Sequence, residues 1–134
     1  MTLEVEKRGF TAWLEMQFDH YGNGQCRCWL DITDRHRNIY GVVHGGVTYS
    51  LLDTAMGVAV WTQLQEGERT ATVEIKVTYC RPVREGRLVA EGRVVERTRQ
   101  LAFTSGEVRD AAGELVAMTT GTFYIYGQPA DEQA

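Results

Sequence analysis

A short segment in the first half of the chain carries residues whose types and spacing suit the attack of water on an activated acyl group. It contains Asn38, His44, Gly45 and Gly46, and Asp53 follows eight residues after the first glycine. A carboxylate can activate water at neutral pH if its surroundings raise its basicity. Two glycines at a helix start can offer backbone N–H groups to a developing anion, helped by the helix dipole. The segment therefore predicts a hydrolytic site.

The surroundings of Asp53 are unusual for a charged residue. On a helix it would share a face with Tyr49, Met56, Gly57 and Val60. A partly desolvated setting raises the pKa of a carboxyl group unless hydrogen bonds oppose it. A mid-helix Asp is usually a solvated surface residue, but apolar neighbours on every side favour a catalytic role here.

The other residues of the segment have structural alternatives that the sequence leaves open. Gly45 and Gly46 could form only a tight turn into a helix. Asn38 could cap a loop, and His44 could line a pocket wall without taking part in chemistry. Thr72 lies in a strand rich in threonine, which ordinary β propensity also explains.

Hydrophobic periodicity predicts the elements that would position these residues. Apolar and polar residues alternate over 12–19, 25–32 and 70–79, which is typical of half-buried strands. Gly22, Asn23 and Gly24 supply a hairpin turn between the first two strands. A polar loop spans 33–43, and further strands are predicted over 88–96, 101–109 and 115–126.

A single long helix is predicted from about Gly46 to Leu64, and apolar residues cover nearly every side of it. Such a helix is buried on all sides, so we expect the strands to wrap it. The predicted fold class is α+β, with an antiparallel sheet of five to six strands around one central helix. An exposed sheet edge and a helix too apolar for half a shell together predict a homodimer.

Length and composition set the remaining bounds. The chain has 134 residues, 43% of them hydrophobic, and a net charge of −4, which predicts one domain over 1–126 and a flexible tail over 127–134. The acidic balance argues against a nucleic-acid partner. We expect a cytoplasmic protein without a membrane segment, because no apolar run reaches spanning length and the three cysteines suit a reducing compartment.

No metal site is predicted from the cysteines and histidines. Cys26 and Cys28 fall on one strand face, while His20, His36 and His44 are scattered along the chain without metal-ligand spacing. We therefore expect the two thiols to lie in the core.

These features together resemble a known family. The stretch from Asn38 through His44-Gly45-Gly46-Val47 to Leu52-Asp53-Thr54-Ala55, then the strand from Thr72 to Tyr79 with Arg81-Pro82 after it, is similar to hotdog-fold thioesterases of the PaaI-like group, which act on acyl-coenzyme A. The resemblance extends from about Trp13 to Ile125. It implies a hotdog fold and hydrolysis of an acyl-CoA thioester, with no cofactor because CoA is part of the substrate.

The resemblance also implies roles for single residues. Asp53 matches the catalytic carboxylate, acting as general base or as nucleophile, and the Gly45 N–H matches the donor that polarises the thioester carbonyl. Asn38 matches the side chain that positions the water or the carboxylate, His44 lies beside the thioester, and Thr72 falls near the water. In this family the site straddles a dimer interface, and many members are dimers of dimers.

Binding of the CoA phosphates is the least specific part of the resemblance. Relatives often carry Gly-Arg where this chain has the stretch from Arg97 to Gln100. Arginine suits phosphate because its guanidinium binds two oxygens at once. Arg81, Arg84, Arg97 and Arg99 are therefore candidates for the phosphate end, together with the Gly46 amide.

Two other functions remain open at this stage. An enoyl-thioester hydratase or dehydratase on the same fold would need a His and an acid that move a proton at the acyl α-carbon. A non-catalytic acyl-CoA binding protein is the third class. The identity of the acyl group, aryl, arylacetyl or short to medium chain, is not encoded in any pattern that we recognise.

Overall fold

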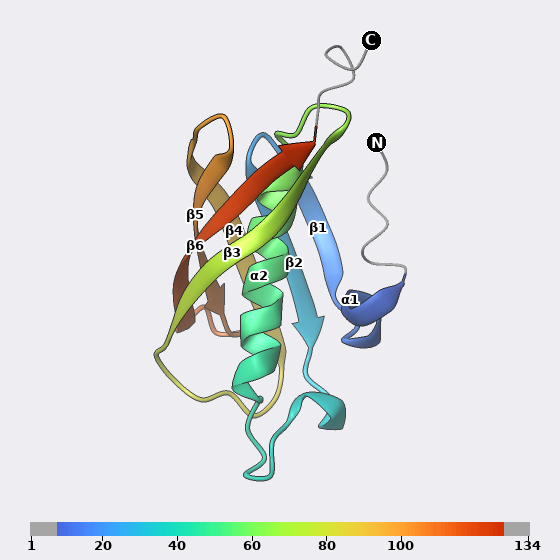
Figure 1. The fold of residues 1–134 in the computed structure, drawn as a ribbon. Coiled ribbons are helices and arrows are strands. Elements are labelled where there is room, and N and C mark those ends of the chain that lie inside the picture. Colours follow the sequence, from blue (N-terminus) through green and yellow to red (C-terminus); the bar gives the residue numbers. More distant parts are fainter. Residues whose placement is uncertain (1–7, 128–134) are drawn as a thin grey trace.

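In a computed structural model, which describes residues 8–127, one curved antiparallel sheet wraps around one long helix (Figure 1). The elements in chain order are α1 (Gly9–Trp13), β1 (Gln17–Gly22), β2 (Gln25–Asp31), the 3-10 helix η1 (Asp34–His36), α2 (Gly45–Trp61), β3 (Glu68–Tyr79), β4 (Arg87–Arg97), β5 (Leu101–Arg109) and β6 (Leu115–Gly127). The strands pair in the order β1-β2-β4-β5-β6-β3, and all neighbours are antiparallel. The predicted α+β hotdog architecture is confirmed.

The first hairpin forms as its turn residues predict. Asn23 and Gly24 both have left-handed backbones, with φ of 53° and 77°, as a two-residue hairpin turn of type I′ requires. The strand predicted over 12–19 is wrong in its first half, because residues 9–13 form α1 and β1 begins only at Gln17. Glu15 turns the chain with φ of 61°.

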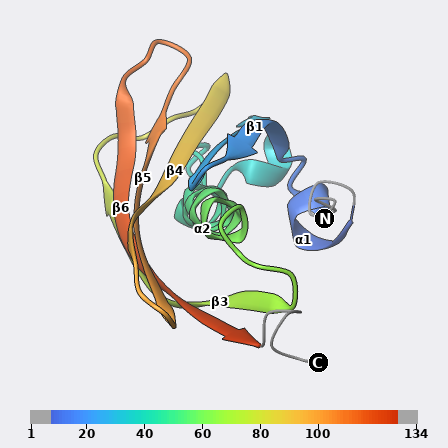
Figure 2. The ribbon, with the colours of Figure 1, turned by 90° about the horizontal axis from the view of Figure 1, so that it is seen from above.

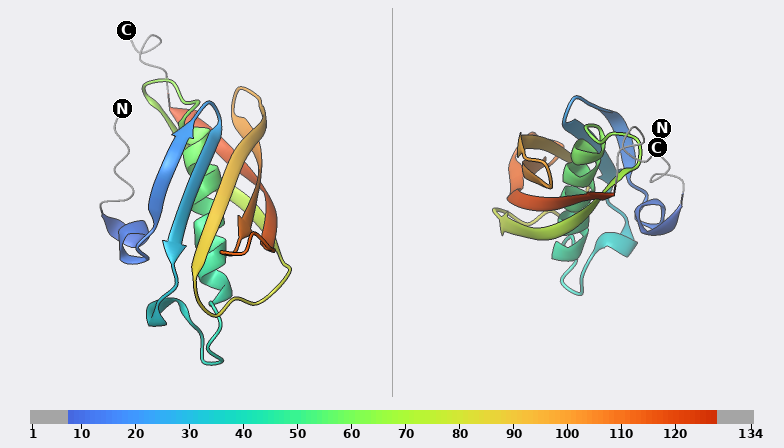
Figure 3. Two further views of the ribbon diagram at one scale, coloured as in Figure 1. Left: turned by 180° about the vertical axis from the view of Figure 1, so that it is seen from behind. Right: turned by 45° about the horizontal axis from the view of Figure 1, so that its top comes forward.

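The helix α2 buries one broad apolar face against the concave side of the sheet. Leu51, Leu52, Ala55, Met56 and Ala59 are fully buried there. The left view of Figure 3, from behind, shows β2 and β4 passing in front of α2, with β1 beside β2. Burial of this face supplies most of the stability of the helix, because isolated helices of this length are marginal in water.

The helix can approach β4 closely because Gly92 has no side chain. A Cβ atom at this position would lie 2.6 Å from the carbonyl carbon of Ala55, which no real side chain tolerates. The glycine therefore allows α2 to lie close to β4, and so sets the distance between the helix and the sheet.

One stripe of α2 is not covered by strands, so the expectation of a helix buried on all sides is correct only for the sheet side. Ser50, Asp53, Gly57 and Trp61 are all partly exposed, and their spacing of three or four residues puts them on one face. Figure 2 looks along the helix and shows the sheet curling from β1 to β3, with α1 rather than a strand on the side of α2 between these two edges.

The strand β3 is a long edge strand. Eleven of its twelve residues pair with β6 on one side, and none of the described strands pairs with its other side. Val73 and Tyr79 are 59% and 51% exposed. The predicted free edge is thus present, although β1 forms a second one. Of the predicted tail over 127–134, Gly127 ends β6 and the rest lies outside the described residues.

Candidate active site

Asp53 lies on the open stripe of α2 and is held by the edge strand. The Thr72 hydroxyl donates a hydrogen bond of 2.8 Å to Asp53 Oδ1. Burial raises the pKa of the Asp53 carboxyl, and the Thr72 hydrogen bond opposes this shift by stabilising the carboxylate. The result is an ionisable acid with increased basicity, held in a fixed orientation.

An open groove of about 310 Å³ begins at this carboxylate. It runs between α2 and β3, and its walls are mostly apolar, formed by Gly57, Val58, Trp61 and Phe123. The groove has room for a small apolar or aromatic group next to Asp53. This is the shape of a ligand site with a reactive group at one end.

The His44-Gly45-Gly46 segment forms the start of α2, where the sequence predicted the beginning of a helix. His44 is the N-cap residue, and its Nδ1 accepts a hydrogen bond of 2.8 Å from the Gly46 N–H. An N–H group can only donate, so Nδ1 carries no proton and the proton of the neutral ring is on Nε2. The Gly46 amide, proposed above as an anion donor, is therefore occupied by the ring.

The Gly45 N–H has a different status. None of the residues 8–127 provides an acceptor for it, and it lies in the first turn of a seventeen-residue helix. Free N–H groups at this end of a helix carry the positive end of the helix dipole. Gly45 is therefore the amide of the pair that is able to stabilise an oxyanion.

Tyr79 fixes this glycine and was not identified as a site residue from the sequence. Its hydroxyl donates a hydrogen bond of 2.7 Å to the Gly45 carbonyl oxygen, and a Cβ on Gly45 would lie 3.3 Å from the Tyr79 oxygen. Burial of the phenol, with a contribution from Tyr49, raises the pKa of Tyr79, so it remains a donor at neutral pH. In the sequence, Tyr79 is only one member of an alternating strand pattern.

The loop before α2 is organised by Asn38. Its Oδ1 accepts hydrogen bonds from the N–H groups of Tyr40 at 2.9 Å and Val42 at 3.3 Å. The loop-capping alternative for Asn38 is thus present in the structure. The side-chain NH₂ is not used by any described residue, so the same side chain can also donate to a ligand.

His36 anchors this loop to the rest of the fold. The ring is fully buried, with Nδ1 accepting from the Thr33 N–H and Nε2 donating to the Leu14 carbonyl, both at 2.9 Å. Its own carbonyl accepts from the His44 N–H at 2.8 Å. His36 therefore contacts the N-terminal segment through its ring and the N-cap of α2 through its backbone carbonyl.

Asp53 and Gly45 are not brought together within one chain. They lie on the same helix eight residues apart, which corresponds to about 12 Å along its axis. A base and an oxyanion donor acting on one carbonyl must each lie within hydrogen-bond reach of the reacting atoms. Gly45 instead lines a separate hollow of about 380 Å³ with Tyr79 and Arg81.

The four candidate arginines divide into two pairs at opposite ends of α2. Arg84 donates to the Tyr40 carbonyl at 3.2 Å and Arg81 forms an ion pair with Glu114, both near the helix start. Arg97 and the exposed Arg99 lie at the other end, near the residues that follow the helix. Seventeen helical residues separate the pairs by about 25 Å.

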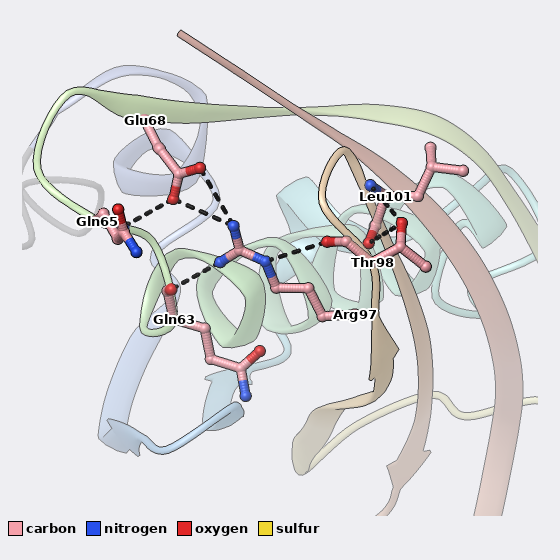
Figure 4. A network of polar contacts seen from close by, with 6 residues as sticks. All are labelled: Gln63, Gln65, Glu68, Arg97, Thr98 and Leu101. Carbon is pink, nitrogen blue, oxygen red and sulfur yellow. Dashed lines mark hydrogen bonds and ion pairs between the residues drawn. The ribbon is translucent and has the colours of Figure 1, made fainter. Parts of the chain in front are cut away.

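Arg97 is bound within the fold (Figure 4). Its guanidinium donates to both oxygens of Glu68 at 3.2 Å and to the Gln63 carbonyl at 2.8 Å. Burial alone would raise the pKa of Glu68, but the Gln65 N–H and Arg97 outweigh it and hold the pKa below its usual range. Arg97 thus ties the β4–β5 turn to the end of α2.

Two further features bear on cofactors and membranes. Cys26 and Cys28 are buried in the core as expected. Within residues 8–127 there is no group of three or more His, Cys, Asp or Glu that could hold a metal ion. None of the helices in the described part of the chain has the length and hydropathy of a membrane-spanning segment.

Comparisons with known proteins agree with the geometry. Residues 40–117 match the family model of the thioesterase superfamily. Human acyl-coenzyme A thioesterase 13 is 29% identical over 104 residues, which cover 76% of this chain and 74% of that protein.

Solved structures extend the similarity to the fold. A conserved protein from Pseudomonas aeruginosa is 29% identical with a TM-score of 0.87, covering 92% of this chain and 98% of that one. A variant of the phenylacetic acid degradation protein PaaI from Thermus thermophilus is 27% identical with a TM-score of 0.78, covering 84% and 95%.

The hydrogen bond between Thr72 and Asp53 gives a direct prediction. Replacing Thr72 by Val keeps the shape of the side chain and removes the donor that lowers the pKa of Asp53. The pKa of Asp53 should therefore rise above its wild-type value, as measured by carbon NMR titration of labelled aspartates. Thr120→Val, on the exposed outer face of β6, should leave it unchanged. An unchanged or lower pKa in Thr72→Val would show that this hydrogen bond does not act on the carboxylate.

Proposed function

The chain belongs to the thioesterase superfamily, and we propose that it hydrolyses the thioester bond of an acyl-CoA to the free acid and CoA at a site shared by two copies of the chain. Asp53 of one copy activates water, and the Gly45 N–H of the other polarises the carbonyl. The observation that carries the proposal is the half-buried Asp53, with its raised pKa, at the end of an apolar groove.

The chemistry follows from the geometry of these groups. Asp53 takes a proton from water as the water oxygen forms a bond to the thioester carbon, and the carbonyl oxygen becomes an oxyanion at the Gly45 N–H. Collapse of this intermediate breaks the C–S bond, and the thiolate leaves with the proton that Asp53 holds. General-base catalysis contributes about 10²–10⁴-fold, and one oxyanion donor contributes roughly 3–4 kcal/mol.

The free edge of β3 supports the shared site. Two-fold pairing of β3 with its copy would continue the sheet and cover the open stripe of α2. The two α2 helices would then run antiparallel, so the start of one would face the end of the other. This arrangement removes the separation of about 12 Å between Asp53 and Gly45 within one chain, because each would face the other residue of the second copy.

The same two-fold symmetry would also bring the two separated pairs of arginines together. Antiparallel helices bring Arg81 and Arg84 of one copy to the same end of the dimer as Arg97 and Arg99 of the other. We assign the CoA phosphates to this end, with Arg99 the freer member of its pair, since Arg97 is bound by Glu68.

A dimer of dimers would use the outer face of the sheet, where Tyr124 stacks on Tyr126 at 6.0 Å between ring centres.

The alternative functions have less support. A hydratase or dehydratase requires a histidine that accepts a proton from the acyl α-carbon, but the Nδ1 of His44 is bonded to the Gly46 N–H and its Nε2 already carries the ring proton. A protein that only binds acyl-CoA has no need to hold a carboxylate in a partly desolvated position, which is unfavourable for stability. No observation favours either function over hydrolysis.

Replacing Asp53 by Asn tests the role of the carboxylate. Release of free thiol from a panel of short, medium, aryl and arylacetyl CoA thioesters should fall at least about 10²-fold, because the base is lost. A carboxyl whose pKa is raised on folding stabilises the fold below its unfolded pKa, near 3.8, and loses that contribution as the pH rises through the folded pKa. Asn should therefore leave stability at neutral pH unchanged or increased in urea unfolding. Undiminished turnover would remove Asp53 from the mechanism.

Replacing Gly45 by Pro tests the oxyanion donor with little disturbance of the helix. Proline is favoured at the first helical position, and His44 has the extended backbone that precedes proline, with φ of −61° and ψ of 135°. The matched control is Gly45→Ala, which adds the same Cβ beside Tyr79 but keeps the N–H. We expect kcat for Gly45→Pro to fall by about 10²–10³ relative to Gly45→Ala. Equal kcat values would exclude the Gly45 amide as the donor.

A further inference from the structure

The two peptide units that meet at the Gly45 Cα atom are held by other groups of the chain. In the first unit, the His44 carbonyl accepts a hydrogen bond of 2.9 Å from the Val47 N–H. In the second unit, the Gly45 carbonyl accepts from the Tyr79 hydroxyl at 2.7 Å. The N–H of this second unit, that of Gly46, donates to His44 Nδ1 at 2.8 Å. Of the polar atoms in the two units, the Gly45 N–H is the one for which the described part of the chain provides no acceptor.

These bonds matter because the segment contains two successive glycines. A glycine can adopt a wide range of backbone angles, whereas each peptide unit is planar. Hydrogen bonds at both polar atoms of the second unit fix the orientation of its plane. Because the two planes meet at the Gly45 Cα atom, release of the second unit would also allow the Gly45 N–H to turn.

Tyr79 can act as a fixed support because the end of β3 is anchored to β6. Tyr79 pairs with Ala117, and the next N–H, that of Cys80, donates to the Val116 carbonyl at 2.7 Å. The phenol reaches from the sheet to the start of α2, where its oxygen would lie 3.3 Å from a Cβ atom on Gly45. The hydroxyl is therefore held against the glycine by the backbone of the sheet.

We propose that Tyr79 is a positioning residue for hydrolysis, whose hydroxyl holds the peptide unit between Gly45 and Gly46 so that the Gly45 N–H points at the carbonyl oxygen of the substrate. The inference rests on the proposed function, because it assumes that this N–H stabilises the oxyanion. An oxyanion donor is effective only when it is already aimed at the position where the charge develops. Loss of the support should therefore lower kcat more than it changes KM.

Replacing Tyr79 by Phe keeps the ring against Gly45 and removes only the hydroxyl. In the full-length protein, with the CoA thioester that wild type hydrolyses fastest, kcat should fall about tenfold, while KM changes by less than about twofold. The matched control is Tyr124→Phe, which removes a hydroxyl from the outer face of β6 and should leave both constants unchanged. A kcat of Tyr79→Phe within about twofold of wild type overturns the inference.

Double variants show whether the hydroxyl acts through the Gly45 N–H. Gly45→Ala keeps this N–H and Gly45→Pro removes it, and both add a Cβ atom beside the phenol. Adding Tyr79→Phe should lower kcat further in the Gly45→Ala background and leave it unchanged in the Gly45→Pro background, because the amide that Tyr79 positions is then absent. If both backgrounds respond alike, the hydroxyl acts elsewhere and the inference is overturned.

The support can also be measured without substrate. In isotope-labelled protein, Tyr79→Phe should shift the NMR resonance of the Gly46 amide and speed its exchange with solvent, because its peptide unit has lost one of its two bonds. An unchanged Gly46 amide overturns the inference while the hydrolase function stands. Failure of wild type to hydrolyse any thioester of the panel overturns the proposed function, and the assignment of Tyr79 with it.

Discussion

The packing of α2 against the edge strand β3 is the constraint on which the rest of the site depends. Two hydrogen bonds cross this contact, from Thr72 to Asp53 and from Tyr79 to the Gly45 carbonyl. One orients the carboxylate and the other fixes the peptide that follows the N-cap. Because β3 is also the open edge of the sheet, the strand that positions both functional groups is the strand on which a second copy would dock.

The open stripe of α2 explains why a helix that is apolar by composition carries an acid. The sheet covers the face that contains Leu51, Leu52 and Ala55, and close approach at Gly92 seats the helix deeply. The opposite face remains partly exposed, with Asp53 at its centre and a mostly apolar groove beside it. Burial then raises the pKa of Asp53, and the hydrogen bond from Thr72 opposes this shift.

Much of this fold could be predicted from the sequence because its elements are locally regular. The sequence predicted all six strands, three of them from clear alternation, and the Asn23-Gly24 turn predicted the first hairpin. The short helix α1 could not be found in this way, since Leu14 and Met16 are buried as an alternating strand would bury them, although Glu15 turns the chain between them. A five-residue helix offers too few positions for a period of 3.6 to stand out.

The candidate site was only partly predictable from the sequence. Most of its residues lie close together along the chain, but the fold decides which of them face each other. Asp53 and Gly45 are close in sequence, yet the rise of the helix separates them. The arginines look like one cluster along the chain, although α2 divides them into two pairs. Tyr79 had no distinguishing signal in the sequence, since its importance comes from a hydrogen bond to the carbonyl of Gly45, 34 residues earlier in the chain.

The most direct test of a site shared between two chains is a mixing experiment with the Asp53→Asn and Gly45→Pro variants. Each variant alone should be inactive, because both of its sites are defective. After the two are unfolded and refolded together in equal amounts, the account predicts recovery of about a quarter of wild-type turnover, since half of the dimers then carry one intact site. Mixed dimers that form, as seen by native mass spectrometry, but remain as inactive as their parents would contradict it.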